Sequence, residues 1–168
     1  MSQDSKNIVL PKRLYKYSVK REFDLSVSDN TTTDHRISDS CGIRLALTAL
    51  GLHDDEQENM VVFFLDARHR IKGYEIITRG LLDSTAVHPR EIFRTAIING
   101  CAKIALAHNH PSGDSQPSPK DYLVTKRLIK ASNILAIPIL DHCIIASNFE
   151  GIQFYSMQDS RTFPVVPS

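Results

Sequence analysis

The segment Lys103-Ile-Ala-Leu-Ala-His-Asn-His-Pro-Ser-Gly-Asp-Ser-Gln-Pro-Ser-Pro-Lys-Asp121 carries, in one short run, the signals of a strand, a loop and the start of a helix. Residues 103–108 alternate larger apolar side chains with alanines, which predicts a buried strand. Proline and glycine residues then break the chain into a loop. Ser118, Pro119 and Asp121 are typical of a helix N-cap, first position and third position.

Three side chains of this segment are candidate metal ligands. His108 and His110 are two residues apart, so their rings lie on the same side at the end of an extended strand. Asp121 follows in the first turn of the helix to which the loop returns. Two histidines and one carboxylate, with a further position open to water, are a ligand set of catalytic zinc. Simpler interpretations stay open: Ser118 and Asp121 can form only a capping box, and a His-x-His pair can arise by chance among seven histidines.

The spacing of His108-x-His110-Pro111, a short loop and Ser118-x-x-Asp121 resembles the JAMM metal-binding motif of the JAB1/MPN metalloprotease superfamily. The expanded string His108-Asn109-His110-Pro111-Ser112-Gly113-Asp114, together with Pro117-Ser118, resembles the RadC branch of that superfamily. Further stretches resemble RadC proteins at matching intervals: Phe64-Leu65-Asp66, Arg79-Gly80, His88-Pro89-Arg90-Glu91 and Asp141-His142. The resemblance spans residues 38–155 and implies a JAB1/MPN fold, a cytidine-deaminase-like three-layer α/β/α arrangement.

The resemblance also implies a role for each motif residue. His108, His110 and Asp121 are expected to bind Zn²⁺, and Ser118 is expected to stabilise the oxyanion that forms when a carbonyl is attacked. The general acid/base of the superfamily is an upstream glutamate, and Glu58, which immediately precedes an apolar run, matches its segment. Three neighbouring acids keep that assignment open: Asp54, Asp55 and Glu56.

These roles predict a zinc-dependent hydrolase of the metallopeptidase type, which uses a metal-activated water to cleave an amide bond of a protein or peptide substrate. Two alternatives stay open: a non-catalytic or DNA-repair-associated binding protein, and a zinc-dependent nuclease. A zinc nucleobase deaminase is disfavoured because its His-x-Glu and Pro-Cys-x-x-Cys signature is missing.

The length of 168 residues and the apolar content of 42% predict one domain with a terminal arm. We expect a basic N-terminal arm and linker at 1–34, the metal-binding domain at 35–158 and a frayed tail at 159–168. A net charge of +1 argues against a nucleic-acid-binding surface over the whole molecule, although the basic arm can contact nucleic acid. From its length we expect a RadC-like protein that lacks the helix-hairpin-helix region that many RadC proteins carry before this domain.

The location of the protein is predicted from what its sequence lacks. No apolar run approaches the roughly 18 residues of a membrane span, and the polar N-terminus is unlike a secretory signal. We therefore expect a cytoplasmic protein without a membrane partner. The three cysteines, Cys41, Cys101 and Cys143, have neither metal-ligand nor disulfide spacing and are predicted to be small buried apolar groups.

Hydrophobic periodicity and turn residues predict the other elements. Strands are expected at 14–25, 60–65, 71–78 and 136–146, and helices from residue 38 or 40 to Gly51, from Pro89 to Asn99 and from Ser118 onward. This order predicts an α/β fold with a mixed, largely antiparallel sheet flanked by helices. His142 is predicted to be a hydrogen-bonded group in the core or beside the ligands, and His88 to serve the turn before its helix.

Overall fold

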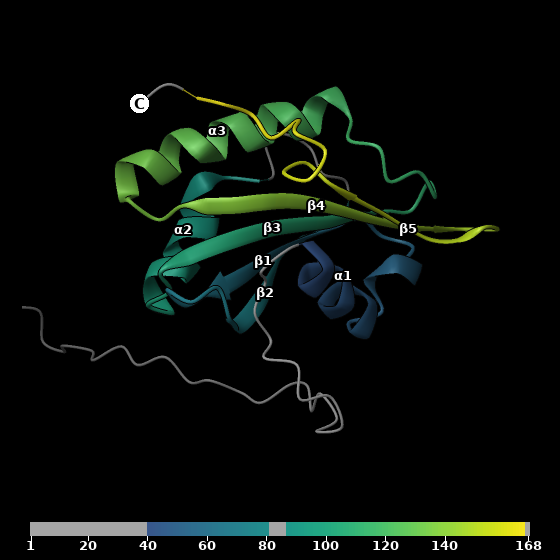
Figure 1. The fold of residues 1–168 in the computed structure, drawn as a ribbon, viewed down its shortest axis with the longest axis horizontal. Helices are drawn as coiled ribbons and strands as arrows, with labels where there is room; N and C mark the ends of the chain where they lie inside the picture. The colour runs from purple at the N-terminus through teal and green to yellow at the C-terminus, as the bar shows by residue number, and fades with distance from the viewer. Residues whose placement is uncertain (1–39, 81–86, 167–168) are drawn as a thin grey trace, which may run out of the picture. The chain divides into compact units, whose positions relative to one another are not determined.

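The computed structural model describes residues 40–80 and 87–166 (Figure 1). The basic arm at 1–34 and the strand expected at 14–25 lie outside the described residues, so the predictions about them stay predictions. Within the described ranges, no helix is both long enough and apolar enough to cross a membrane.

Five strands form a single sheet in the order β2-β1-β3-β4-β5. Their bounds are β1 Asn59–Leu65, β2 Ile71–Arg79, β3 Lys103–His110, β4 Ile139–Asn148 and β5 Gly151–Ser156. The pair β3 and β4 is parallel, and the other neighbouring pairs are antiparallel. Parallel strands need a long crossover connection, which the helix α3 (Pro119–Leu135) provides here. The predicted mixed, largely antiparallel sheet is confirmed.

Helices cover both faces of this sheet. Besides α3, they are α1 (Ser40–Ala49), α2 (Pro89–Ile98) and the short 3-10 helix η1 (Leu52–Asp54). One apolar core joins the sheet to α2 and α3 and includes Phe93 and Leu128. A second core joins the opposite face to α1 and η1 and includes Ile43 and Leu47. Figure 1 shows α3 above the sheet and α1 below it, which confirms the predicted α/β class with three layers.

The central strand β3 sets the direction of the candidate ligands. Ile104 and Leu106 pack in the core beneath α2 and α3, whereas the intervening alanines pack in the core beside α1. Because side chains alternate along a strand, His108 continues the face of Ile104 and Leu106. The strand extends to His110, two residues beyond its predicted end, because that residue still pairs with β4.

The start of β4 differs from the sequence prediction. The strand expected at 136–146 begins at Ile139 and ends at Asn148. Ala136 instead ends α3 in the left-handed conformation, with φ 54°, and its amide donates to the carbonyl of Ser132. Periodicity does not reveal that conformation, because a left-handed residue at a helix end is usually glycine or asparagine.

The tail prediction is wrong for the described residues 159–166. Phe163 and Val166 pack against the core that contains α2 and α3. The backbone amides of Thr162 and Phe163 both donate to the carbonyl of Met157, at 2.8 and 2.9 Å. The chain is therefore held in place by two apolar side chains whose partners the sequence pattern does not reveal.

The prediction for the cysteines holds only in part. Cys143 is fully buried in the core beside α1, as expected. Cys101 is half-buried, and Cys41 is exposed in the first turn of α1. The prediction of three buried apolar groups is therefore wrong for Cys41, because its position on the helix faces solvent.

Candidate metal centre

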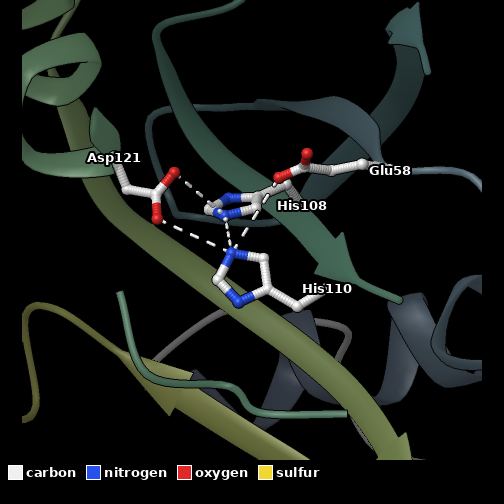
Figure 2. Close-up of side chains that lie close together, drawn as sticks. All are labelled: Glu58, His108, His110 and Asp121. Carbon is white, nitrogen blue, oxygen red and sulfur yellow. Dashed lines mark hydrogen bonds and ion pairs between the residues drawn. The ribbon is translucent and has the colours of Figure 1, made fainter. Parts of the chain in front are cut away.

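Four side chains from three separate parts of the fold converge at one end of the sheet (Figure 2). His108 and His110 lie at the end of β3, Asp121 lies in the first turn of α3, and Glu58 immediately precedes β1. Because β1 and β3 are antiparallel, with Met60 opposite His108, the start of one strand lies beside the end of the other. One ligand atom from each of the four side chains lies within 4.8 Å of the others.

The two imidazole rings are the closest pair in this cluster. The Nε2 atoms of His108 and His110 are 2.9 Å apart. The Nε2 atom of His108 is 3.3 Å from Oδ1 of Asp121, and that of His110 is 3.6 Å from Oδ2. Oε1 of Glu58 is 3.9 Å from Nε2 of His110. The structure therefore brings together the three predicted ligands and the nominated glutamate.

The start of α3 orients the carboxylate of Asp121. Oδ2 of Asp121 accepts hydrogen bonds from the backbone amide of Ser118 at 2.6 Å and from its hydroxyl at 2.7 Å. In return, the amide of Asp121 donates to Oγ of Ser118 at 3.3 Å, which completes the predicted capping box. Oδ1 stays turned toward His108. The capping box and the metal-ligand interpretation are thus compatible, because each uses a different edge of the same carboxylate.

The loop between β3 and α3 orients the ring of His110. Nδ1 of His110 lies 2.7 Å from the carbonyl oxygen of Asp114. Gly113 has φ 84°, a left-handed conformation that favours glycine, and its amide donates to the carbonyl of His110. The side chain of Asn148 donates to the carbonyl of Gly113 at 3.1 Å, which ties the loop to the end of β4.

The ring of His108, by contrast, is held by the core. His108 is fully buried, and its Nδ1 lies 2.8 Å from Nε2 of His142 in β4, which is also fully buried. Burial, and then the nearby His108, lower the pKa of His142 well below its usual value, so this ring is neutral at pH 7. The predicted role of His142 as a hydrogen-bonded group beside the ligands is confirmed. The predicted role of His88 is also confirmed, because its ring accepts from the amide of Arg90 at the start of α2.

The surroundings of the cluster favour the ionised form of the Asp121 carboxylate. Burial by itself raises the pKa of Asp121, but the rings of His108 and His110 outweigh burial and hold that pKa well below its usual range. Burial by itself lowers the pKa of His110, but Asp121, a backbone carbonyl and Glu58 outweigh it and raise that pKa. The site therefore stabilises positive charge at the point where the four side chains meet.

These residues fit a divalent cation such as Zn²⁺. A carbonyl oxygen only accepts, so Nδ1 of His110 must carry the proton, and Nε2 of the neutral ring presents a lone pair. That lone pair, the other imidazole and two carboxylates face one another within 4.8 Å. Electron-pair donors this close together repel one another unless a proton or a cation lies between them. Imidazole nitrogen and carboxylate oxygen are both zinc ligands.

The position of Glu58 separates it from its acidic neighbours. Asp54 pairs with His53 and is largely exposed, and Asp55 accepts from the amide of Gln57. Glu56 is exposed. Among the acids of residues 54–58, only Glu58 lies within reach of the two histidines and Asp121. This placement favours Glu58, while its catalytic role stays a prediction.

Asn109, between the two histidines, holds Glu58 in place, and the sequence analysis missed it. Its Oδ1 accepts from the amide of Asn59 at 2.8 Å, and its Nδ2 donates to the carbonyls of Asp55 and Gln57 at 3.2 and 2.9 Å. These bonds fasten the segment that leads into β1. Its place directly after a predicted buried strand and between two candidate ligands was the sequence signal, since a buried asparagine side chain needs hydrogen-bond partners.

The cluster opens into a surface pocket of about 290 Å³. The pocket is lined by Glu58, His110, Pro111, Ser112, Ser118, Lys120 and Asp121. His108 lies beneath these residues and is fully buried. A substrate that enters from the surface therefore meets both carboxylates and one imidazole.

Comparison with known proteins agrees with this geometry. The model of the RadC-like JAB domain matches residues 42–162. A UPF0758 protein of Cyanothece sp. is 37% identical over 133 residues, which cover 79% of this chain and 55% of the relative. A UPF0758 protein of Desulforamulus reducens is 42% identical over 110 residues, which cover 66% of this chain and 47% of the relative.

A UPF0758 protein of Methanosarcina acetivorans is 35% identical over 108 residues, which cover 64% of this chain and 45% of the relative. The chain spans about half the length of these curated relatives. It belongs to the RadC family of JAB-domain proteins, as its motif predicted. The five-stranded mixed sheet with helices on both faces is consistent with a JAB/MPN fold.

Proposed function

We propose that this protein is a zinc-dependent hydrolase that cleaves an amide bond, peptide or isopeptide, in a protein or peptide substrate. The observation that carries the proposal is the convergence of two histidines and two carboxylates at a surface pocket. Two histidines with one carboxylate match a ligand set of catalytic zinc, and the second carboxylate supplies an acid/base group.

His108, His110 and Asp121 would hold the ion. Bound zinc lowers the pKa of a water molecule to about 7 and polarises a carbonyl group. The carboxylate of Glu58 takes a proton from the attacking water and delivers it to the nitrogen of the leaving amine. The C–N bond breaks, and the products are a carboxylic acid and an amine.

Ser118 is suited to stabilise the oxyanion after a small rotation. Its hydroxyl proton is donated to Oδ2 of Asp121, so it must turn toward the substrate oxygen to act there. Asp121 keeps its orientation during that rotation, because the backbone amide of Ser118 still donates to the same oxygen. An oxyanion donor of this kind is worth about 2.7–4 kcal/mol.

The wider setting of the reaction belongs to the same proposal. We place it in the cytoplasm, with a protein or peptide as the partner. An amide fits better than a phosphodiester, because the cluster offers ligands for one ion and two-metal sites are a common arrangement in nucleases. Binding of nucleic acid by the basic arm remains a separate prediction.

The test compares the zinc-loaded protein with Glu58→Gln on a fluorescence-quenched peptide library. We expect both proteins to bind zinc to the same level, because three ligands remain. Glu58→Gln should lose about 10²–10⁴-fold in cleavage rate, the usual contribution of a general acid/base. The matched control is Glu56→Gln, which makes the same change at an exposed neighbouring position and should cleave at the parental rate.

Three results would contradict parts of this proposal. Parental activity in Glu58→Gln would assign the proton transfer to another group, and loss of zinc in that variant would make Glu58 a ligand. Zinc-dependent cleavage of plasmid or single-stranded DNA in the absence of peptide cleavage would make the protein a nuclease. Zinc binding without hydrolysis of either substrate would indicate a binding protein.

A further inference from the structure

A chain of buried hydrogen bonds connects the backbone of Asp121 to the ring of His108. Thr125 lies on α3 one turn after Asp121 and is fully buried. Its Oγ1 is 2.6 Å from the carbonyl oxygen of Asp121 and 2.6 Å from Nδ1 of His142. Nε2 of His142 is in turn 2.8 Å from Nδ1 of His108. The chain therefore joins α3, β4 and β3.

The backbone carbonyl of Asp121 determines which atom donates in each hydrogen bond of this chain. A carbonyl oxygen only accepts, so the hydroxyl of Thr125 donates its single proton to Asp121. Oγ1 can then only accept from His142, so Nδ1 of His142 carries a proton. Full burial of the ring in the core disfavours a second proton, so Nε2 of His142 is an acceptor and Nδ1 of His108 must donate to it. This leaves Nε2 of His108 with a lone pair that faces His110 and Asp121.

The opposite direction would leave a buried contact without a proton. If His142 donated through Nε2, its Nδ1 would accept from Thr125, and no proton would remain between Oγ1 and the carbonyl of Asp121, 2.6 Å away. Two oxygen acceptors at that distance in a buried site repel each other. The remaining acceptor near the hydroxyl is the sulfur of Met157, at 3.9 Å, which is a weak partner.

We propose that Thr125 and His142 are positioning residues, which hold His108 in the tautomer that carries its proton on Nδ1 and presents Nε2 to the cation. The proposal rests on the proposed metal centre for its purpose, although the tautomer can be tested without any metal. His110 needs no such chain, because the carbonyl of Asp114 sets its tautomer locally. The buried ring is oriented by the core, and the ring at the pocket is oriented by a loop.

The chain also links two ligands to each other. Asp121 contributes its backbone carbonyl to one end of the chain and its carboxylate to the cation site at the other. A shift of α3 relative to β4 would therefore disturb the orientation of His108 together with that of Asp121. Partners that orient a metal-binding histidine typically change metal affinity by about 10–100-fold when removed.

The first experiment is a histidine-ring nitrogen–proton NMR spectrum of the metal-free protein at mildly alkaline pH. We expect both His108 and His142 to carry their proton on Nδ1. This measurement needs no variant for its result, and it does not depend on catalysis. A His108 ring that carries its proton on Nε2 would overturn the proposal.

The second experiment measures zinc affinity by competition with a chelating dye. Thr125→Val keeps the shape of the side chain but removes the hydroxyl, and we expect it to weaken zinc binding by about 10–100-fold and to mix the ring tautomers. Thr125→Ser restores the hydroxyl and should restore both readouts. The matched control is Thr95→Val, since Thr95 is also buried but donates to a carbonyl of its own helix α2.

The readouts separate a positioning role from a structural one. A purely structural role would lower the melting temperature of metal-free Thr125→Val, yet leave its zinc affinity and ring tautomers unchanged, and that result would overturn the proposal. If Thr125→Val does not fold, the parental tautomers and the zinc affinity of Thr125→Ser still decide. If the parental protein binds no zinc, the proposed function fails, while the tautomer measurement still tests the hydrogen-bond chain.

Discussion

The two faces of β3 end in different chemistry. On the face toward α2 and α3, Ile104 and Leu106 lead to His108, which joins the cation cluster. On the opposite face, small alanines lead to Asn109, whose side chain holds residues 55–59 through hydrogen bonds. One face carries two candidate ligands, and the other face holds the segment that contains Glu58.

The difference shows how one strand can carry candidate metal ligands on one face and hold a neighbouring segment with the other. His108 acts through its own side chain at the cluster, whereas Asn109 acts on the backbone of residues 55–59. Changes on the two faces should therefore have separable effects on zinc content, turnover and stability, in that they remove different contacts.

The largest effect is expected from His108→Ala. Removal of one of three candidate ligands should reduce bound zinc from about one ion per chain to less than about a tenth, because the remaining ligands hold the ion weakly. The measurement is elemental zinc analysis of the purified protein, with far-ultraviolet circular dichroism to show that the fold persists.

The control for that change is His69→Asn. His69 lies in the turn between β1 and β2 and has φ 65°, a conformation that asparagine tolerates. It should keep the parental zinc content. Parental zinc in His108→Ala would break the comparison, because the ligand face would then not bind the ion.

A smaller effect is expected from Asn109→Ala on the opposite face. The change removes the partner of the buried amide of Asn59 and of the carbonyl of Asp55, which should lower the free energy of unfolding by about 1–3 kcal/mol, while the carbonyl of Gln57 still accepts from the side chain of Asn59. Misplacement of Glu58 should lower kcat by up to about 10²-fold. Zinc content should stay parental.

Urea unfolding, zinc analysis and peptide cleavage measure these three quantities for Asn109→Ala. Asn133→Ala, the same change at an exposed position of α3, should alter none of them. Loss of zinc in Asn109→Ala with unchanged kcat per bound ion would show that the two faces are not separable in this way.

The smallest effect is a pH dependence of the metal-free protein. The lowered pKa of Asp121 stabilises the fold above the unfolded value of about 3.9, and the raised pKa of His110 stabilises it below the unfolded value of about 6.5. The stability that Asp121 and His110 contribute should therefore be greatest between these values, whereas the lowered pKa of His142 favours the fold as the pH rises through about 6.5. The melting temperature of the parental protein relative to Asp121→Asn, which retains His142, should fall by a few degrees as the pH rises through the pKa of His110.

The stabilisation that zinc adds should instead grow with pH, because zinc binds neutral imidazole. Melting curves at about pH 5.5 and pH 8, with a chelator or with saturating zinc, measure both trends. In the chelator, the parental protein should exceed Asp121→Asn in melting temperature by more at about pH 5.5 than at about pH 8. A parental advantage over Asp121→Asn that grows toward about pH 8 would contradict the assigned direction for His110.

Sequence reasoning succeeded where the signal was local. The alternation of residues 103–108 predicted a buried strand with His108 and His110 on one side, and Ser118 with Asp121 predicted the capped start of α3. It failed where the partner was distant in sequence. The packing of Phe163 and the hydrogen bonds of Asn109 depend on segments whose positions the pattern does not encode.

The sequence by itself determined the types and spacing of the candidate ligands and the α/β class, because strand and helix periodicity are properties of neighbouring residues. Only the tertiary structure decided that Glu58, rather than the adjacent acids, faces the histidines, since the antiparallel pairing of β1 with β3 sets that position. It also decided the position of Thr125, which lies 17 residues from His142 in sequence yet 2.6 Å from its ring. Directional hydrogen bonds need both partners in place, and no single segment of the chain contains both.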